Sequence, residues 1–285
     1  MGLFRSLLRA FSVSQTSSPI QDVPSPLPKR SDSFEDKTDF GPEYQQLFSS
    51  ATDSNLNYTD YTFSGKYTKT GKMRTKRHIR IFKNEDVLSS IEALGYEEPI
   101  TYSRDVPSPP SESQLAYLHD LAAERHERIP ATLSSADASA LISRYVDHDR
   151  IPNPALFQYA DEMHIGISYY MGKRMLYDVV FAQLKNPDRT AFFIFCIYRD
   201  FNHAIEGNLN RCCYKELFYT FAESVINDTK FQKSMDENYY GADLRFFGSK
   251  YSKTLGYSLT GGSRRTYAYK HAKDFLLSHR LISDE

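Results

Sequence analysis

The stretch YTDYTFSGKYTKTGKMRTKRHIRIFK occupies residues 58–83 and decides how this part of the chain can fold. Its first part, as far as Tyr67, is rich in Tyr, Phe and Thr, which favour strands. A turn is expected at residues 69–72, where Gly71 can adopt a positive φ. Residues 75–83 then alternate polar and apolar side chains, as a second strand does. The stretch therefore predicts a β-hairpin.

The residues after the hairpin complete a small unit. Asn84 can cap a helix whose start is acidic, and Gly95 can end that helix. Residues 96–102 can return as a third strand. We therefore expect a small ββαβ unit over residues 58–104, followed by an extended Pro/Ser linker at residues 105–111.

The chain before the hairpin has a different character. In residues 1–11 apolar side chains recur at helical spacing with arginines between them, which predicts an amphipathic helix. Residues 12–57 are polar, with Ser and Pro concentrated in their first half. Such a segment buries too little apolar surface to offset its ordering entropy, so we expect a disordered linker. The start Met-Gly with Ser6 also fits an acylation pattern at Gly2.

The last part of the chain, residues 151–285, predicts a mainly helical domain of five or six helices. The apolar stretch at 190–201 should be central in it, and Pro187 is expected at the first position of that helix. Ser263 can cap the last helix. The expected fold class is α+β and predominantly helical, with a disordered N-terminal arm, a small ββαβ unit, a helix pair and a C-terminal helical domain.

The helix pair is expected at residues 112–150, where Ser111 or Ser113 can start the first helix and Ser134 the second. Here SESQLAYLHDL, followed by LSSADASALIS, resembles a short helical module that recurs in bacterial and phage proteins, some of which carry it beside DNA-processing domains. The resemblance covers residues 111–146, implies a bacterial or phage origin, suggests work on nucleic acids and supplies no catalytic residues. The matching residues are Gln114, Leu115, Tyr117, Leu118, Ser134, Asp137, Ala138, Ser139, Leu141 and Ile142.

The strongest candidate site lies in the hairpin. Residues 66–83 carry eight basic side chains, and no acidic residue lies between Tyr61 and Asn84. Phosphates need cations and unstacked bases need flat surfaces, so this basic, aromatic hairpin predicts contact with DNA or RNA. A solvated hairpin whose lysines protect an edge strand would show the same composition. The candidate nucleic-acid-binding residues are Lys66, Tyr67, Lys69, Lys72, Arg74, Lys76, Arg77, Arg80 and Lys83.

A second candidate site is for anions, before the last helix. Two glycines ahead of a helix start can expose backbone N–H groups to an anion, and two arginines add positive charge. A flexible turn with a serine cap explains the same residues. The candidate anion-binding residues are Gly261, Gly262, Ser263, Arg264 and Arg265.

Common catalytic signatures are not found. The sequence has no Gly-x-Ser-x-Gly, no Walker loop and no Gly-x-Gly-x-x-Gly, and the adjacent Cys212 and Cys213 lack the ligand spacing of zinc sites. We therefore predict no catalytic residue, cofactor or metal. An enzyme remains an alternative, with a site in residues 160–285 that would join Arg199 and His203 to the two arginines above.

Composition limits the class of protein. The 35 basic and 36 acidic side chains exclude a wholly basic nucleic-acid binder but allow a local patch. Three cysteines favour a reducing compartment, and no apolar run is long enough to cross a membrane, so we expect a cytoplasmic protein. The leading hypothesis is a non-enzymatic accessory protein that contacts nucleic acid. The alternative is an adaptor that uses residues 1–11 to bind another protein or a membrane surface.

Overall fold

The computed structural model describes residues 55–202, 207–239, 250–252, 257–259 and 263–283, all within one unit that runs from Phe40 to Glu285. The predicted helix at 1–11, most of the predicted linker at 12–57, His203 and the glycine pair Gly261–Gly262 lie outside the described residues. No helix among the described residues is long and apolar enough to cross a membrane.

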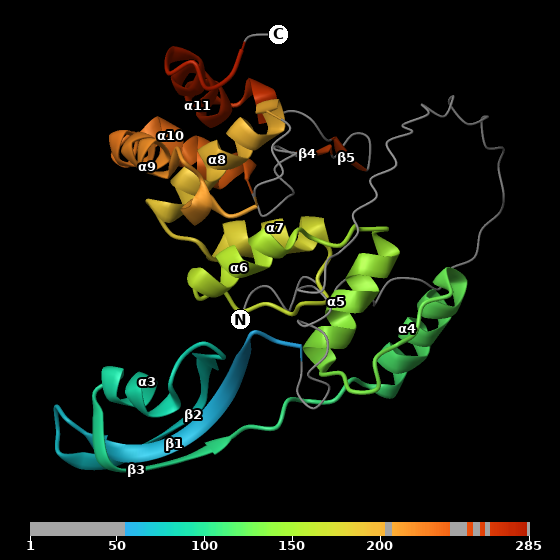
Figure 1. Cartoon of the computed structure of the whole chain (residues 1–285), viewed down its shortest axis with the longest axis vertical. Coiled ribbons are helices and arrows are strands. Elements are labelled where there is room, and N and C mark those ends of the chain that lie inside the picture. The colour runs from blue at the N-terminus through green and yellow to red at the C-terminus, as the bar shows by residue number, and fades with distance from the viewer. Residues whose placement is uncertain (1–54, 203–206, 240–249, 253–256, 260–262, 284–285) are drawn as a thin grey trace. The chain divides into compact units, whose positions relative to one another are not determined.

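The first described unit is a three-stranded antiparallel sheet with one helix, as the sequence predicts. The strands β1 (Tyr58–Tyr67), β2 (Lys72–Phe82) and β3 (Tyr96–Arg104) lie in the order β2-β1-β3, and α3 (Val87–Ala93) packs on one face (Figure 1). Apolar side chains of the strands and the helix meet on that face. The buried members of this core are Phe63, Ile81, Ile91 and Tyr96.

The start of α3 differs from the prediction. Asp86 caps it, because its side chain accepts a hydrogen bond from the backbone N–H of Ser89 at 2.9 Å. Asn84 lies instead inside a turn in which Glu85 N–H donates to the carbonyl of Phe82 at 3.0 Å. The prediction of Asn84 as the cap was wrong, although Gly95 follows the helix end with φ +84° as expected.

The helix pair consists of α4 (Glu112–Arg125) and α5 (Ser135–Val146), each of which begins with a reciprocal capping box. Ser111 caps α4 with Gln114, and Ser134 caps α5 with Asp137. The side-chain amide of Gln114 also donates to the hydroxyl of Ser139 at 3.1 Å, which ties the two helices together. Most residues that carry the resemblance therefore cap or pack these helices. Those that are buried are Leu118, Ser134, Asp137, Ala138, Leu141 and Ile142.

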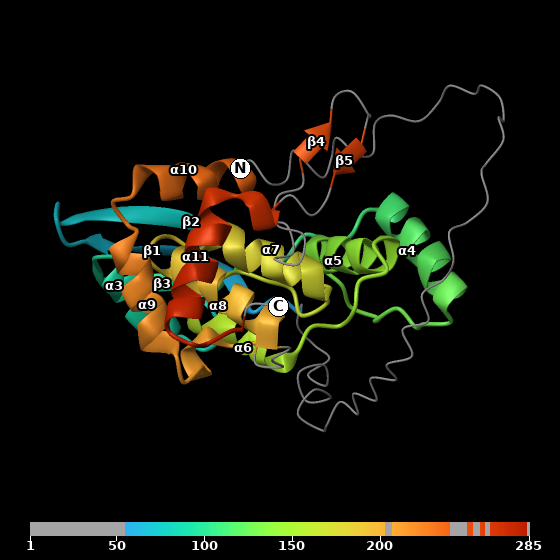
Figure 2. The same cartoon turned by 90° about the horizontal axis from the view of Figure 1, so that it is seen from above.

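The remaining helices surround α8. Its residues 191–197 are all buried, and it packs against α7, α9 and α11 (Figure 1, Figure 2), so the expected central position is confirmed. Two short strands pair antiparallel before the last helix. The elements are α6 (Pro154–Glu162), α7 (Lys173–Gln183), α8 (Asp188–Asn202), η1 (Leu209–Arg211), α9 (Lys215–Ser224), α10 (Thr229–Asn238), β4 (Lys250–Ser252), β5 (Tyr257–Leu259), η3 (Ser263–Arg265) and α11 (Tyr267–Ser278).

Two helix starts in this part lie later than predicted. Thr266, not Ser263, caps α11, because Ser263 begins the 3-10 turn η3 and the hydroxyl of Thr266 accepts from the backbone N–H of Tyr269 at 3.3 Å. Helix α8 begins at Asp188, so Pro187 precedes the helix rather than filling its first position.

A short segment ahead of β1 connects the sheet to the helices. The sequence predicts that residues 55–57 belong to the linker, but Leu56 and Asn57 are buried. Asn57 exchanges hydrogen bonds with Ile167: its backbone N–H donates to the Ile167 carbonyl at 3.1 Å, and its side-chain oxygen accepts from Ile167 N–H at 2.8 Å. The Asn57 carbonyl also accepts from Lys83 N–H at 2.9 Å, so this segment holds the ends of β1 and β2.

Candidate nucleic-acid interface

The turn of the hairpin is tightly hydrogen-bonded. The carbonyl of Tyr67 accepts from the backbone N–H of Thr70 at 3.0 Å and of Gly71 at 2.8 Å, and Gly71 has φ +64°. Thr68 donates both its N–H and its hydroxyl to the carbonyl of Gly95, each at 2.9 Å. The expected glycine turn is confirmed, and it is anchored to the end of α3.

A β-bulge decides which side chains of β2 face α3. Tyr61 pairs with Ile79, but Phe63 pairs with Lys76, so Arg77 and His78 together oppose one residue of β1. His78 accommodates the extra residue with φ +55°. Beyond the bulge, alternation places three cations on the face that packs against α3. These are Lys76, Arg74 opposite Gly65, and Lys72 opposite Tyr67.

These three cations remain exposed although they share a face with the core. The main contacts of helix α3 are with β3, and residues 72–78 of the edge strand β2 are all exposed. Lys69 in the turn and Arg77 in the bulge are exposed as well. Among the described residues, none of these five cations forms an ion pair. We call Lys69, Lys72, Arg74, Lys76 and Arg77 the cation row.

The other predicted cations of the hairpin have acidic neighbours from elsewhere in the chain. Lys66 pairs with Glu97 of β3 at 2.7 Å. Arg80 lies 3.7 Å from Asp60 of β1 and covers the ring of Tyr58. The charge of Lys83 affects the carboxyl of Asp161. Burial raises the pKa of this carboxyl, and the positive charge of Lys83 lowers it. Residues 62–83 contain no acid, but folding brings an acidic side chain near each of three of the nine candidates.

The aromatic residues of the hairpin are largely engaged inside the protein. Phe63 is buried against Tyr96, with ring centroids 4.9 Å apart. Tyr67 also contacts Tyr96, and the guanidinium of Arg74 lies 4.9 Å from its ring centroid. Burial raises the pKa of the Tyr58 hydroxyl, and the positive charge of Arg80 partly offsets this rise. The predicted stacking role of Tyr67 is therefore not favoured by its surroundings.

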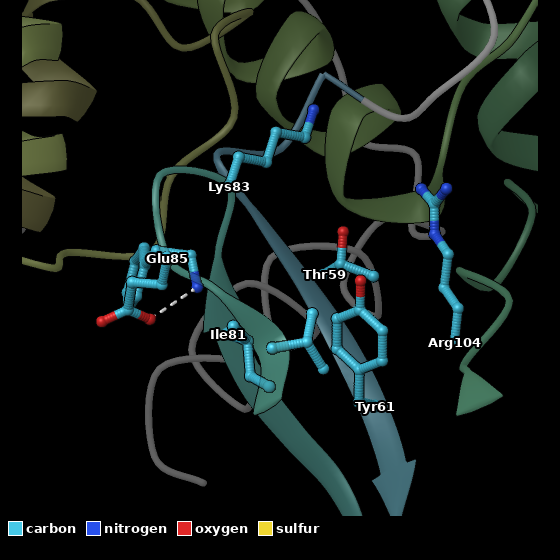
Figure 3. A pocket seen from close by; sticks show the side chains of 8 residues that line it. Thr59, Tyr61, Ile81, Lys83, Glu85 and Arg104 are labelled. Atoms are coloured by element: carbon cyan, nitrogen blue, oxygen red, sulfur yellow. Dashed lines mark hydrogen bonds between the residues drawn. The ribbon is translucent and has the colours of Figure 1, made fainter. Parts of the chain in front are cut away.

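An open hollow of about 320 Å³ lies on the α3 side of the sheet at the opposite end from the turn. Figure 3 shows Lys83 and Arg104 on either side of it, with the side chains of Thr59 and Tyr61 between them. The carboxylate of Glu85 also lines the hollow, where it accepts the N–H of Phe82 at 3.0 Å. Arg104 was not a candidate from sequence, because it lies outside the basic stretch. The only sequence signal is that Arg104 and Tyr102 are two residues apart on one strand, which places both side chains on the same face of the sheet.

The second predicted site is only partly within the described residues. Arg264 and Arg265 follow Ser263 in η3, and Arg264 forms an exposed ion pair with Asp200 at 3.6 Å. Arg199, which the enzyme hypothesis groups with these arginines, instead donates to the hydroxyl of Tyr177 and lies against Phe195. The contacts therefore assign Arg199 and Arg264 to different neighbours.

The described part of the chain contains no group of three or more His, Cys, Asp or Glu side chains that could hold a metal ion. Cys196 is buried within α8, Cys212 is partly buried, Cys213 is exposed, and none of the three is in a disulfide. No protein-family model, curated protein or solved structure matches this chain.

Proposed function

We propose that the protein is a non-enzymatic accessory protein that binds nucleic acid through the cation row. One observation carries the proposal. Five exposed cations lie together on an edge strand and its turn without an ion pair among the described residues, whereas their neighbours Lys66 and Arg80 meet acids. The fold thus separates the cations of this hairpin into a neutralised group and an open one.

The arrangement has an electrostatic cost without a partner. Lys72, Arg74 and Lys76 alternate along one strand and share one face, so about 7 Å separates each from the next. Like charges at this separation repel one another, and water screens them only in part. Edge protection needs a lysine or two, not a row of like charges. A polyanion would turn the repulsion into attraction, and it would release counterions on binding.

The experiment is fluorescence anisotropy of the full chain with labelled DNA and RNA, at low and near-physiological salt. One variant replaces Lys72, Arg74, Lys76 and Arg77 with Glu. A matched control makes the same change in net charge at exposed basic residues outside the sheet. The control positions are Arg128, Lys185, Arg211 and Lys270.

The two variants separate a local site from general charge. We expect the hairpin variant to lose at least about 100-fold in affinity at low salt, because four phosphate contacts become repulsive. The control should lose much less, since its charges are scattered. Equal losses in both variants, or affinity that survives the hairpin swap, would show that the cation row is not the binding site. Circular dichroism of both variants establishes that they fold.

A further inference from the structure

We infer that the ligand of the cation row is a nucleic-acid duplex, held by its phosphate backbone, rather than a single strand held by its bases. This inference rests on the proposed function and adds the class of substrate to it. Three features carry it: the engagement of the aromatic rings, the placement of the cations along a strand that the sheet holds rigid, and the position of the exposed tyrosine of the sheet.

The aromatic rings beside the row have little free surface for a base. Proteins that hold single strands stack successive bases on exposed aromatic faces. Here Phe63 is 1% exposed, and Tyr96 beneath it is 4% exposed. Tyr67 contacts Tyr96 and Arg74, and the ring of Tyr58 is covered by Arg80 with 3.5 Å between the guanidinium and the ring centroid. A strand of unpaired bases would have to displace these contacts before it could stack.

The cation row suits a dense line of phosphates. From Lys72 to Lys76 the strand covers roughly 13 Å, at about 3.3 Å per residue. A duplex carries one charge per ~1.7 Å of its axis, about twice the density of either of its strands. Because β2 is paired with β1 on both sides of the bulge, its cations from Lys72 to Lys76 are already aligned and binding orders little backbone. Charge density then decides the preference, and it favours the duplex.

The half-exposed tyrosine of the sheet lies away from the row. Tyr102 is 48% exposed and meets Tyr61 edge to face, with ring centroids 6.1 Å apart. It belongs to β3, and in the order β2-β1-β3 two strand spacings, about 10 Å, separate it from the row. A base stacked on Tyr102 would draw the backbone away from β2. Tyr102 therefore provides the test that distinguishes stacking from phosphate contact.

The experiment measures the affinity of the full chain for a labelled duplex of about 20 base pairs, for each of its separate strands, and for a duplex RNA of the same sequence, over a range of salt. We expect the duplexes to bind at least about 10-fold more tightly than the single strands. The logarithm of the duplex affinity should fall with the logarithm of salt at a slope of about −4, as four to five phosphate contacts require. Tyr102→Ala should leave duplex affinity within about twofold, because a phosphate-based mode does not use this ring.

Three results would overturn the inference. The first is that single strands bind as tightly as the duplex. The second is that the affinity for the duplex does not change with salt concentration. A loss of about 10-fold or more in Tyr102→Ala would place a base on that ring. Equal binding of single strands and a loss in Tyr102→Ala leave the proposed function standing, because nucleic acid is still bound. A slope near zero would also contradict binding through the cation row. If no nucleic acid binds even at low salt, both the proposed function and this inference fail.

Discussion

Lys76 lies directly opposite Phe63 in the pairing of β1 with β2, so an exposed cation and a fully buried ring share one face of the sheet. Strict alternation from Ile79 would place Lys76 on the other face. The bulge at Arg77 and His78 reverses the alternation, so the cations continue along the face on which Ile79 and Ile81 face α3. The position of the cation row therefore depends on one extra residue.

The bulge predicts opposite effects for two substitutions of His78. At φ +55°, glycine is unstrained, whereas a β-branched residue is disfavoured by about 1–2 kcal/mol. The contact of His78 with Asp105, whose side chains are 76% and 19% exposed, is lost in both variants, so it does not affect the comparison between them. We expect His78→Gly to unfold in urea at or above the wild-type midpoint and His78→Val to unfold below it. Equal midpoints for the two variants would mean that the bulge is not maintained in solution.

The pairing of Lys66 with Glu97 predicts a variant with increased affinity. Glu97→Gln would remove a negative charge and release Lys66. Lys66 lies opposite Met73, on the other face of the sheet from Lys72 and Arg74, but its side chain reaches the turn at Gly71. Affinity for the duplex should rise several-fold, and the salt dependence should steepen by about one phosphate contact. Both side chains are about half exposed, so the free energy of unfolding should change by less than about 1 kcal/mol.

The matched control for that variant is Glu92→Gln on α3. It removes the same charge from an exposed residue of the same unit, without releasing Lys66. Affinity that rises equally in both variants would point to net charge alone. A larger gain in Glu97→Gln is the expected outcome.

Local signals predicted most of the fold. The strands around Gly71, the helix that ends before Gly95 and the caps at Ser111 and Ser134 depend on residues within a few positions of one another. The errors at Asn84 and Ser263 are also local. In each case a tight turn used the predicted residue, and a capping side chain a few positions later started the helix.

The site could be predicted only in part, because its electrostatics are not local. The basic stretch is visible in sequence, but the acids that neutralise Lys66 and Arg80 come from Glu97 and Asp60, which only strand pairing brings near. The bulge at His78 has no signal in an alternating pattern of this length. Sequence therefore located the hairpin but did not distinguish its open cations from its paired ones.

A buried carboxylate makes α5 sensitive to one substitution. Asp137 is fully buried and accepts hydrogen bonds from the hydroxyls of Ser134 at 2.7 Å and Ser168 at 2.6 Å, and from Asn55 N–H at 3.3 Å. Asp137→Ala leaves these donors without their acceptor, so we expect a loss of about 3 kcal/mol or more in the free energy of unfolding. The exposed Asp120→Ala on α4 should change it by less than about 0.5 kcal/mol. Urea unfolding of both variants measures the difference, and a small effect at Asp137 would show that water replaces the carboxylate.

Asp161 predicts a pH dependence of stability with a definite sign. Burial raises the pKa of its carboxyl, and hydrogen bonds from the Asn57 amide at 2.8 Å and the Tyr169 hydroxyl at 3.1 Å lower it less. The folded protein therefore holds the proton of Asp161 more tightly than the unfolded chain does. Its contribution to stability is complete below the unfolded pKa of about 4 and is lost as pH rises through the higher folded pKa.

Asp161→Asn isolates this contribution, because the amide resembles the protonated acid in shape but does not titrate. The free energy of unfolding of the wild type, minus that of the variant, should be largest near pH 4 and should fall as pH rises above the folded pKa. Urea unfolding at several pH values measures this difference. If it increases with pH instead, the folded pKa is lowered rather than raised, and the charge of Lys83 outweighs burial at this carboxylate. Because Asn57 also holds the ends of β1 and β2, the same titration reports how strongly the sheet is anchored to the helices.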